Sequence, residues 1–340
     1  MGMYARALCA AVAVVGSFTT LAAAVPFELL VTETPTGPVP TDPAQWGGVQ
    51  RWTFTGTGAA AVAGTGIPAA SLSDPAGLSY DNVSNTLFVG NRHANVANSS
   101  ITAFEHDPFG AFTNPVTSTG NSLYGVHQLA LNPTQNELFA ANVNSPVSRF
   151  TNTNGTLANN GIIPITQPTR GVAVSDSGDR LFISTASNII RLWDLNTNTD
   201  DGTFTVTGAS SLHYMRIRNG NELYAADFIN GAAGKVWRLA IDANDDLSIV
   251  GSFDVPGAIG LDFSPDGNEM YVAGHNNGNI YRFLYNSNTN AWDANGLIDT
   301  PFVSLGDLIV IPSESRDIPE PASLGILALG AVGLLARRKR

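Results

Sequence analysis

The chain has 340 residues, of which only 13% are charged, and its 28 acidic residues outnumber the 17 Lys and Arg residues, giving a formal charge of −11. Without Arg6 and the four basic residues at the C terminus, 12 basic residues remain and the formal charge becomes −16. A surface of this sign repels phosphate backbones, so we exclude nucleic acid as a partner.

The composition also indicates the fold class. Gly, Asn, Thr and Ser are abundant, while the strand formers Val, Ile, Phe and Tyr recur in short bursts. Such alternation is typical of many short strands joined by polar turns. The central part of the chain is therefore predicted to be all-β.

The first 24 residues have the pattern of a secretory signal peptide. Arg6 precedes an apolar run over residues 7–15, and three alanines at 22–24 form a small-residue cleavage pattern. Cys9 would allow a lipoprotein signal, but Arg6 stands where such a signal needs an apolar residue. Because Cys9 is the only cysteine, cleavage near Ala24 predicts a mature protein with no disulfide and no Cys metal site.

A pair of strands separated by a polar turn recurs along the chain. The copies are residues 77–80 with 87–91, 129–133 with 138–142, 172–175 with 181–185, 215–218 with 223–227, and 261–267 with 270–274. A third strand with aromatic residues and an arginine follows several pairs, at 147–150, 190–193, 236–239 and 280–283. Equivalent positions lie 43 to 51 residues apart, close to the roughly 40 to 50 of a four-stranded propeller blade.

The first copy of the repeat lacks its first strand. Residues 29–33 look like a second strand with no first strand before them, and residues 49–54 look like the third. Residues 308–311 would supply the missing first strand and close a ring, which hides the sheet edges. We therefore predict a six-bladed β-propeller over residues 25–312, closed by a C-terminal strand. The pattern resembles the lactonase-like, NHL-like and regucalcin/gluconolactonase propellers over residues 26–312.

The last residues combine three elements in order. Pro319, Glu320 and Pro321 follow a linker at 313–318, an apolar stretch covers 322–336, and the chain ends on basic residues, namely Arg337, Arg338, Lys339 and Arg340. This tail at 319–340 resembles the PEP-CTERM sorting signal, also catalogued as the ice-binding-protein C-terminal domain. The resemblance implies cleavage near the motif by an exosortase-type membrane protease. It also implies delivery to the cell surface or extracellular matrix of an exopolysaccharide-producing bacterium.

The physical properties of the tail agree with a transient anchor. The 15 residues of this stretch would form a helix of roughly 22 Å, which is shorter than a hydrocarbon core of about 30 Å. The basic cluster would stay on the cytoplasmic side and place the propeller outside. An ordinary single-pass anchor is the alternative, but it does not explain the Pro-Glu-Pro sequence.

Candidate site residues follow from propeller geometry, because the first strand starts where the second strand ends, beside the central channel. The second strands end on Glu33, Asn91, Asn142, Thr185, Asp227 and Gly274-His275. The first strands start near His127, Arg170 and His213. The side chains expected to line the channel are His127, Arg170, His213 and His275.

Carboxylate and amide oxygens around one channel end are ligands that Ca²⁺ accepts. Glu33, Asn91, Asn142 and Asp227 resemble the metal cluster of regucalcin/gluconolactonase proteins, and the resemblance implies that Asp227 would be the base that activates water for lactone opening. The competing interpretation is that Asn and Asp after a strand form Asx turns. The histidines could be bases, metal ligands or hydrogen-bonded lining residues, and Arg170 could hold a sugar acid or pair with Asp176 or Asp179.

Two functions are consistent with these patterns. The first is a non-catalytic surface or matrix propeller that binds an exopolysaccharide or a surface protein. The second is a calcium-dependent lactone hydrolase that acts at the channel mouth. The sequence contains no Ser nucleophile elbow, phosphate loop or zinc spacing, which favours the binding protein.

Overall fold

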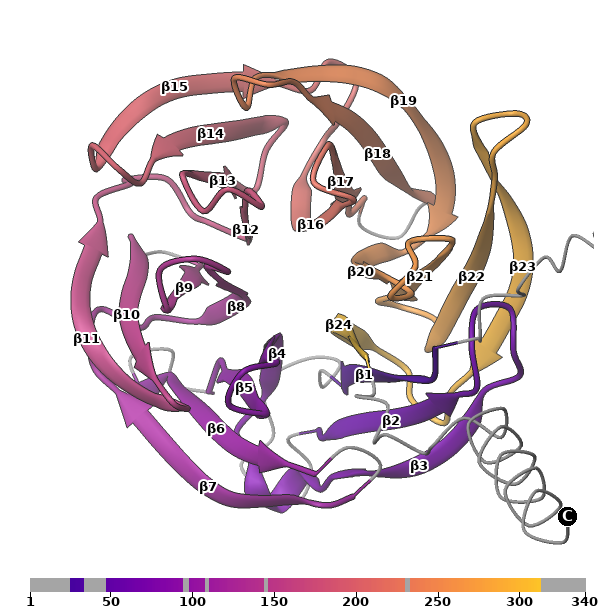
Figure 1. Cartoon of the computed structure of the whole chain (residues 1–340), viewed down its shortest axis with the longest axis horizontal. Helices are drawn as coiled ribbons and strands as arrows, with labels where there is room; N and C mark the ends of the chain where they lie inside the picture. Colours follow the sequence, from indigo (N-terminus) through magenta and orange to yellow (C-terminus); the bar gives the residue numbers. More distant parts are fainter. Residues whose placement is uncertain are drawn as a thin grey trace, which may run out of the picture.

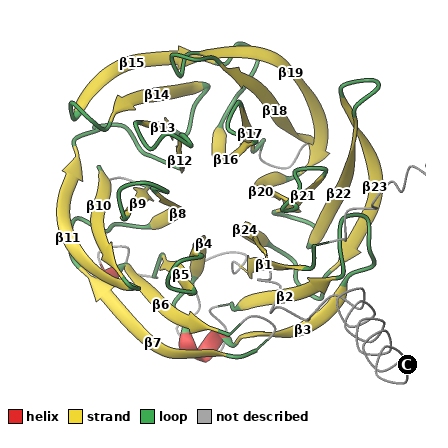
Figure 2. Ribbon diagram, viewed as in Figure 1, coloured by secondary structure: helices red, strands yellow, loops and turns green. Residues whose placement is uncertain are grey.

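Six four-stranded antiparallel sheets surround a common axis in the computed structural model of the protein (Figure 1). The structure describes residues 25–33, 47–93, 98–107, 110–143, 146–229 and 233–312. Helical structure in these ranges is limited to short turns such as Ala69–Ser71 (Figure 2). The predicted six-bladed β-propeller is confirmed.

Each blade contributes an innermost strand and a second strand beside it. The innermost strands are β24 (Leu305–Pro312), β4 (Pro75–Asp81), β8 (Val126–Leu131), β12 (Gly171–Val174), β16 (Leu212–Arg218) and β20 (Ala258–Phe263). The second strands are β1 (Phe27–Glu33), β5 (Thr86–Asn91), β9 (Glu137–Asn142), β13 (Arg180–Ser184), β17 (Glu222–Asp227) and β21 (Glu269–Gly274). In this order they belong to blades 1 to 6.

The third and outermost strands complete the sheets. The third strands are β2 (Val49–Phe54), β6 (Ser100–His106), β10 (Val147–Thr153), β14 (Ile189–Asp194), β18 (Ala233–Ile241) and β22 (Asn279–Asn286). The outermost strands are β3 (Val62–Ile67), β7 (Phe112–Thr119), β11 (Thr156–Ile163), β15 (Thr199–Thr205), β19 (Leu247–Pro256) and β23 (Ala291–Asp299).

Blade 1 is built from both ends of the propeller sequence. Strand β24 pairs antiparallel with β1, placing Phe27 opposite Pro312 and Leu29 opposite Val310. This is the predicted ring closure, and it gives β1 a hydrogen-bonding neighbour on each side. A paired strand has no open edge on which other chains could add.

The hydrophobic core is divided into six clusters, one between each pair of neighbouring blades. Between blades 1 and 6, for example, Phe27 stacks on Phe54 at 4.7 Å between ring centroids, and Tyr271 of blade 6 packs against both rings. Because each sheet packs against a neighbour on both faces, its second strand is buried at almost every position, as in β5. Ring closure is therefore needed to complete the core.

The arginine that recurs in the third strand has a structural role in four blades. It pairs with a glutamate at or near the start of the second strand of the same sheet, and the pairs are Arg51–Glu28, Arg149–Glu137, Arg238–Glu222 and Arg282–Glu269. Blade 4 departs from this pattern, because Arg191 pairs with Asp200 on the outermost strand. The arginine signal in the sequence thus reports sheet packing.

The ring has two distinct faces, which we name by the innermost strands. At the start face each innermost strand begins and each second strand ends, whereas at the end face each innermost strand ends. Phe27, the first residue of β1, and Pro312, the last of β24, are paired at the end face. The described chain therefore starts and finishes on the same face.

Candidate functional site

Side chains from four blades gather at the start face around the axis. Arg170 Nη1 lies 3.3 Å from His127 Nε2, and the rings of His127 and His213 lie 6.4 Å apart. Phe228 stands between His213 and His275, with ring centroids 5.3 Å and 5.1 Å from theirs. We call this set the histidine–arginine cluster, and it consists of His127, Arg170, His213, Tyr214, Phe228 and His275.

The histidines of the cluster are held in the neutral form. Burial lowers the pKa of His127 well below its usual value, and the Arg170 cation lowers it further. Burial and Arg170 together lower the pKa of His213 to about 3. Burial also lowers the pKa of His275, against the backbone carbonyl of Leu305, to which His275 Nδ1 is hydrogen-bonded at 2.8 Å. At neutral pH each ring therefore offers one donor and one acceptor nitrogen.

Two polar atoms of the cluster have no partner among the described residues. Arg170 Nε and His213 Nδ1 are both buried without a hydrogen bond there. Within the same ranges no carboxylate forms an ion pair with Arg170, and burial lowers the pKa of its guanidinium. Asp176 and Asp179, considered as partners from the sequence, follow β12 at the end face, so that interpretation is wrong. The cluster retains hydrogen-bonding capacity that the fold does not use.

The amide and carboxylate groups at the ends of the second strands serve their own blades. Asn91 Oδ1 accepts from Ser73 N at 3.1 Å, and Asn142 Oδ1 accepts from Tyr124 N at 3.1 Å. In both cases the donor lies in the loop that leads into the innermost strand of the same blade. The role is structural, as the competing interpretation held, but the bonds are not Asx turns, because each donor lies 18 residues before the asparagine.

Asp227 occupies the same position in blade 5 and is fully buried. Its carboxylate accepts from Ser211 N at 2.7 Å, from Ser210 N at 3.1 Å and from Trp237 Nε1 at 3.2 Å. Glu33, in blade 1, is half-buried, and burial raises its pKa although the Gly48 backbone N–H opposes the shift. In the described part of the chain, no three His, Cys, Asp or Glu side chains lie close enough to hold a metal ion.

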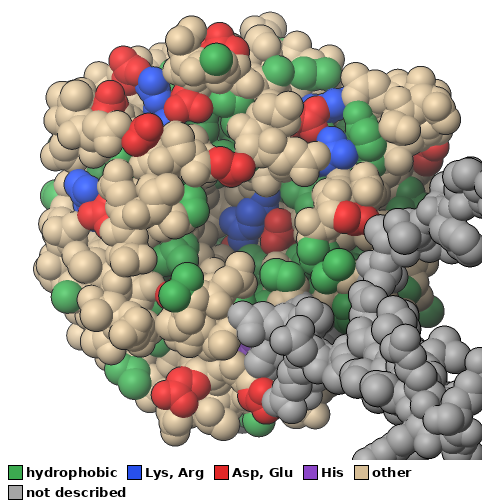
Figure 3. Space-filling view, viewed as in Figure 1, with side chains coloured by type: hydrophobic (Ala, Val, Ile, Leu, Met, Phe, Trp, Pro, Cys, Tyr) green, Lys and Arg blue, Asp and Glu red, His purple; other side chains and the backbone are tan. Residues whose placement is uncertain are grey.

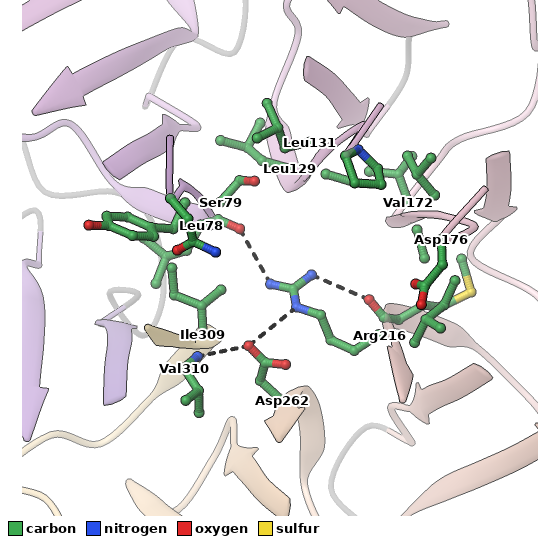
Figure 4. A pocket seen from close by; sticks show the side chains of 18 of the residues that line it. Leu78, Ser79, Leu129, Leu131, Val172, Asp176, Arg216, Asp262, Ile309 and Val310 are labelled. Atoms are coloured by element: carbon green, nitrogen blue, oxygen red, sulfur yellow. Dashed lines mark hydrogen bonds and ion pairs between the residues drawn. The ribbon is translucent and has the colours of Figure 1, made fainter. Parts of the chain in front are cut away.

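A cavity of about 290 Å³ opens at the end face of the ring. Aliphatic side chains of five blades form its wall, and Asp262 comes from the sixth. In the space-filling view the hollow at the centre of the ring contains basic and acidic side chains (Figure 3). The close view shows the guanidinium of Arg216 extending into the middle of this cavity (Figure 4). The lining of the cavity thus combines aliphatic side chains with polar ones, which besides Arg216 and Asp262 include Ser79, Asn82 and Asp176.

Arg216 joins blades that are not neighbours. From blade 5, its Nη2 donates to Asp307 Oδ2 in blade 1 at 2.9 Å and to Leu78 O in blade 2 at 3.3 Å. Its Nε lies 4.0 Å from Asp262 Oδ2. The Asp307 carboxylate also accepts from Leu78 N and Leu308 N, each at 3.0 Å. We call Arg216, Asp262 and Asp307 the axial clamp, because the Oδ2 atoms of both carboxylates and the Arg216 guanidinium join different blades around the axis.

The axial clamp leads to a pH prediction. Burial raises the pKa of Asp307 to about 6, against the effects of Arg216 and the backbone donors, while Asp262 raises it further. The unfolded value is about 3.9, so the folded state binds this proton more tightly, and the stability contributed by Asp307 rises as pH falls from about 6 towards about 4.

Between about pH 7.5 and about pH 5, the wild type should gain about 1 kcal/mol of unfolding free energy relative to Asp307→Asn. Urea denaturation of both proteins at the two pH values measures this difference. Parallel pH profiles for the two proteins would contradict it.

Several residues of the histidine–arginine cluster and of the axial clamp were not among the candidates predicted from the sequence. Tyr214 directly follows His213, and Phe228 directly follows Asp227, so their proximity to candidate residues was the available signal. Asp262 and Asp307 are acidic residues inside otherwise apolar innermost strands, an arrangement that indicates a buried polar role. Arg216 also lies inside an innermost strand, but its partners come from other blades and could not be inferred from the sequence.

Comparison with known sequences accounts for the C terminus. Residues 317–340 match the PEP-CTERM protein-sorting motif. The chain carries a PEP-CTERM sorting signal. The signal implies export, recognition by the membrane protease exosortase, and transient membrane anchoring on the way to a surface or extracellular location. The recognition made from the tail sequence is confirmed, and no curated protein sequence is significantly similar to the chain.

Solved structures resemble the propeller at low sequence identity. A protein assigned as a 6-phosphogluconolactonase from Bacteroides fragilis is 14% identical, with a TM-score of 0.62 over 84% of this chain and 98% of that one. The periplasmic gluconolactonase PpgL of Pseudomonas aeruginosa is 16% identical, with a TM-score of 0.58 over 85% and 100%. A chain of a nidogen/laminin complex is 11% identical, with a TM-score of 0.58 over 85% and 99%. These similarities establish the shared fold and no particular activity.

The predictions for the two chain ends concern residues that the structure does not describe. The signal peptide at 1–24, the linker at 313–318 and the tail at 319–340 lie outside the described residues. Within the described ranges, the structure contains no helix with the length and apolar character to span a bilayer.

Proposed function

We propose that this protein is an exported, exosortase-processed β-propeller that binds an exopolysaccharide or a surface protein without catalysing a reaction. In this proposal residues 1–24 direct export, and residues 322–336 form a short membrane helix held by the basic residues 337–340. Cleavage near Pro319, Glu320 and Pro321 then releases the propeller to the cell surface or extracellular matrix. The PEP-CTERM signal supports export and processing.

One contrast between the two faces supports a binding role at the start face. The carboxylate oxygens of the axial clamp at the end face are all hydrogen-bonded within the fold. The histidine–arginine cluster has unused, buried hydrogen-bonding atoms on Arg170 and His213 among the described residues. Buried polar groups are normally satisfied, and an exception is explained by function or by a bound molecule. A ligand at the start face would supply the missing partners.

A calcium titration distinguishes binding from the hydrolase alternative. We expect calcium to leave the melting temperature unchanged and to give no calorimetric heat, because the Asn91, Asn142 and Asp227 oxygens already accept hydrogen bonds. In parallel, the propeller is tested for retention of polysaccharides and for hydrolysis of gluconolactone. Tight calcium binding together with calcium-dependent hydrolysis would overturn the proposal.

A calcium-dependent lactone hydrolase is the second candidate, and the resemblance to PpgL favours it. In that case Glu33, Asn91, Asn142 and Asp227 would hold the ion, and Asp227 would be the base. The ion would polarise the lactone or a bound water. Such a site needs the Asp227 carboxylate to exchange its bonds to Ser210, Ser211 and Trp237 for the metal. For this reason the geometry supports the binding function better.

A further inference from the structure

We propose that Arg170 and His213 form a subsite for the carboxylate of a sugar acid, such as a single uronic acid residue of a polysaccharide. This inference rests on the proposed binding function and specifies its ligand. It concerns only the described residues of the histidine–arginine cluster. The reasons are the charge of Arg170, the two unpartnered atoms, and the surrounding rings.

Among the described residues, Arg170 supplies a positive charge at the start face with no carboxylate paired to it. Burial lowers the pKa of its guanidinium, as expected for a cation that lacks a nearby anion. Its neighbour Arg92 differs, because Asp74 Oδ2 lies 2.6 Å from Arg92 Nε. A guanidinium with a free edge matches the two oxygens of a carboxylate. The anion expected here therefore carries a single charge located near Arg170.

The unpartnered atoms have the polarity that a sugar acid requires. Arg170 Nε is a donor, and the neutral ring of His213 presents Nδ1 as either a donor or an acceptor. A carboxylate only accepts hydrogen bonds and needs donors such as Arg170 Nε, whereas a sugar hydroxyl can bind both donors and acceptors. Because the histidines are neutral, they add no charge that would favour a doubly charged phosphate. Their chemistry fits a ligand that combines one carboxylate with several hydroxyl groups.

The aromatic part of the cluster fits the apolar face of a sugar ring. Phe228 is half-buried, and its ring meets those of His213 and His275 edge to face. Tyr214 is held in place by its hydroxyl, which lies 3.3 Å from Ala76 O and 3.4 Å from His127 Nδ1. Ligand sites commonly combine such apolar rings with a few placed polar groups. The cluster has both components within neighbouring blades.

The test uses single sugars, so that the measured affinity reports one carboxylate subsite and not the avidity of a polymer. Calorimetry on the exported propeller compares sodium glucuronate with glucose, and inorganic phosphate serves as a second anion. We expect glucuronate to bind at least about tenfold more tightly than glucose or phosphate, since a charge-assisted bidentate contact is lost with either. Equal affinity for glucose and glucuronate would overturn the carboxylate subsite.

Variants identify the residues. Arg170→Met should weaken glucuronate binding at least about tenfold, and Arg170→Lys should recover part of it, since the charge returns without the planar fork. The matched control is Arg191→Met in the same blade, which removes an arginine paired with Asp200 and should leave binding unchanged. Melting temperatures establish that each variant is folded.

The outcomes separate this inference from the proposed function. If polysaccharide is retained by the wild type and by Arg170→Met alike, the subsite is wrong but the binding function stands. If neither polysaccharide nor any of the sugars binds, the subsite and the polysaccharide-binding function are both wrong, and only binding of a surface protein remains from the proposed function. A water molecule alone on Arg170 Nε and His213 Nδ1 would give that second result.

Discussion

Arg216→Met is expected to lower the free energy of unfolding by about 3–5 kcal/mol, because it leaves a buried carboxylate without its cation. Asp307 is fully buried, and Arg216 is its only ion-pair partner among the described residues. Methionine fills the space of the aliphatic stem, so the loss reflects charge more than packing. The loss should be smaller at about pH 5, where Asp307 is protonated more readily. Chemical denaturation at both pH values measures the effect.

Arg191→Met is the control for this measurement as well. Its ion pair lies at the rim of blade 4, where the side chain of Asp200 is 40% exposed, so the loss should stay below about 1 kcal/mol. The double variant Arg216→Met with Asp307→Asn should recover part of the stability, since no buried charge remains. Equal losses from Arg216→Met and Arg191→Met would show that the axial clamp does not hold the ring.

Asp227→Ala is expected to destabilise the protein by roughly 3 kcal/mol, with or without calcium. The substitution leaves the N–H groups of Ser210, Ser211 and Trp237 without their acceptor. Each unsatisfied buried donor costs about 1–3 kcal/mol, and some recover bonds to water. Thermal melting in the presence of calcium or of a chelator measures both the loss and its dependence on metal.

Asp254→Ala in the same blade is the matched control. Asp254 pairs with Lys235, but its side chain is 69% exposed, so its removal should change stability little. If the loss caused by Asp227→Ala appears only when calcium is present, Asp227 is a metal ligand and its structural role is secondary. If the loss is the same in both conditions, the loop-capping role explains this position.

The architecture was predictable because the information for each blade is local. A hairpin such as β20–β21 appears in the sequence as two apolar runs around Pro265, Asp266 and Gly267, and the repeat multiplies this signal. Ring closure could be inferred because the sequence contains no strand before β1 that could be the innermost strand of blade 1. The division into faces followed from the same geometry, and this is why residues as distant as His127 and His275 were expected on one face.

The axial contacts were not predictable, because they join blades far apart in sequence. Gln128 Nε2 donates to Met215 O at 2.7 Å across 87 positions, and Arg216 reaches Asp307 across 91. No local pattern indicates which innermost side chains meet once the ring closes. The role of Asp227 could not be predicted either, since an acidic residue at the end of a strand can cap a loop or bind an ion. Only the positions of Ser210, Ser211 and Trp237 distinguish the two.

The pairing of Phe27 with Pro312 at the end face also has a consequence for orientation at the bilayer. Seven residue steps separate Pro312 from Pro319, and a fully extended chain of that length spans roughly 25 Å. In the proposed topology, in which residues 322–336 anchor the chain, the end face with its cavity would be tethered within that distance of the membrane. The start face lies on the opposite side of the ring, so the histidine–arginine cluster would be accessible to extracellular polymer before the tail is cut.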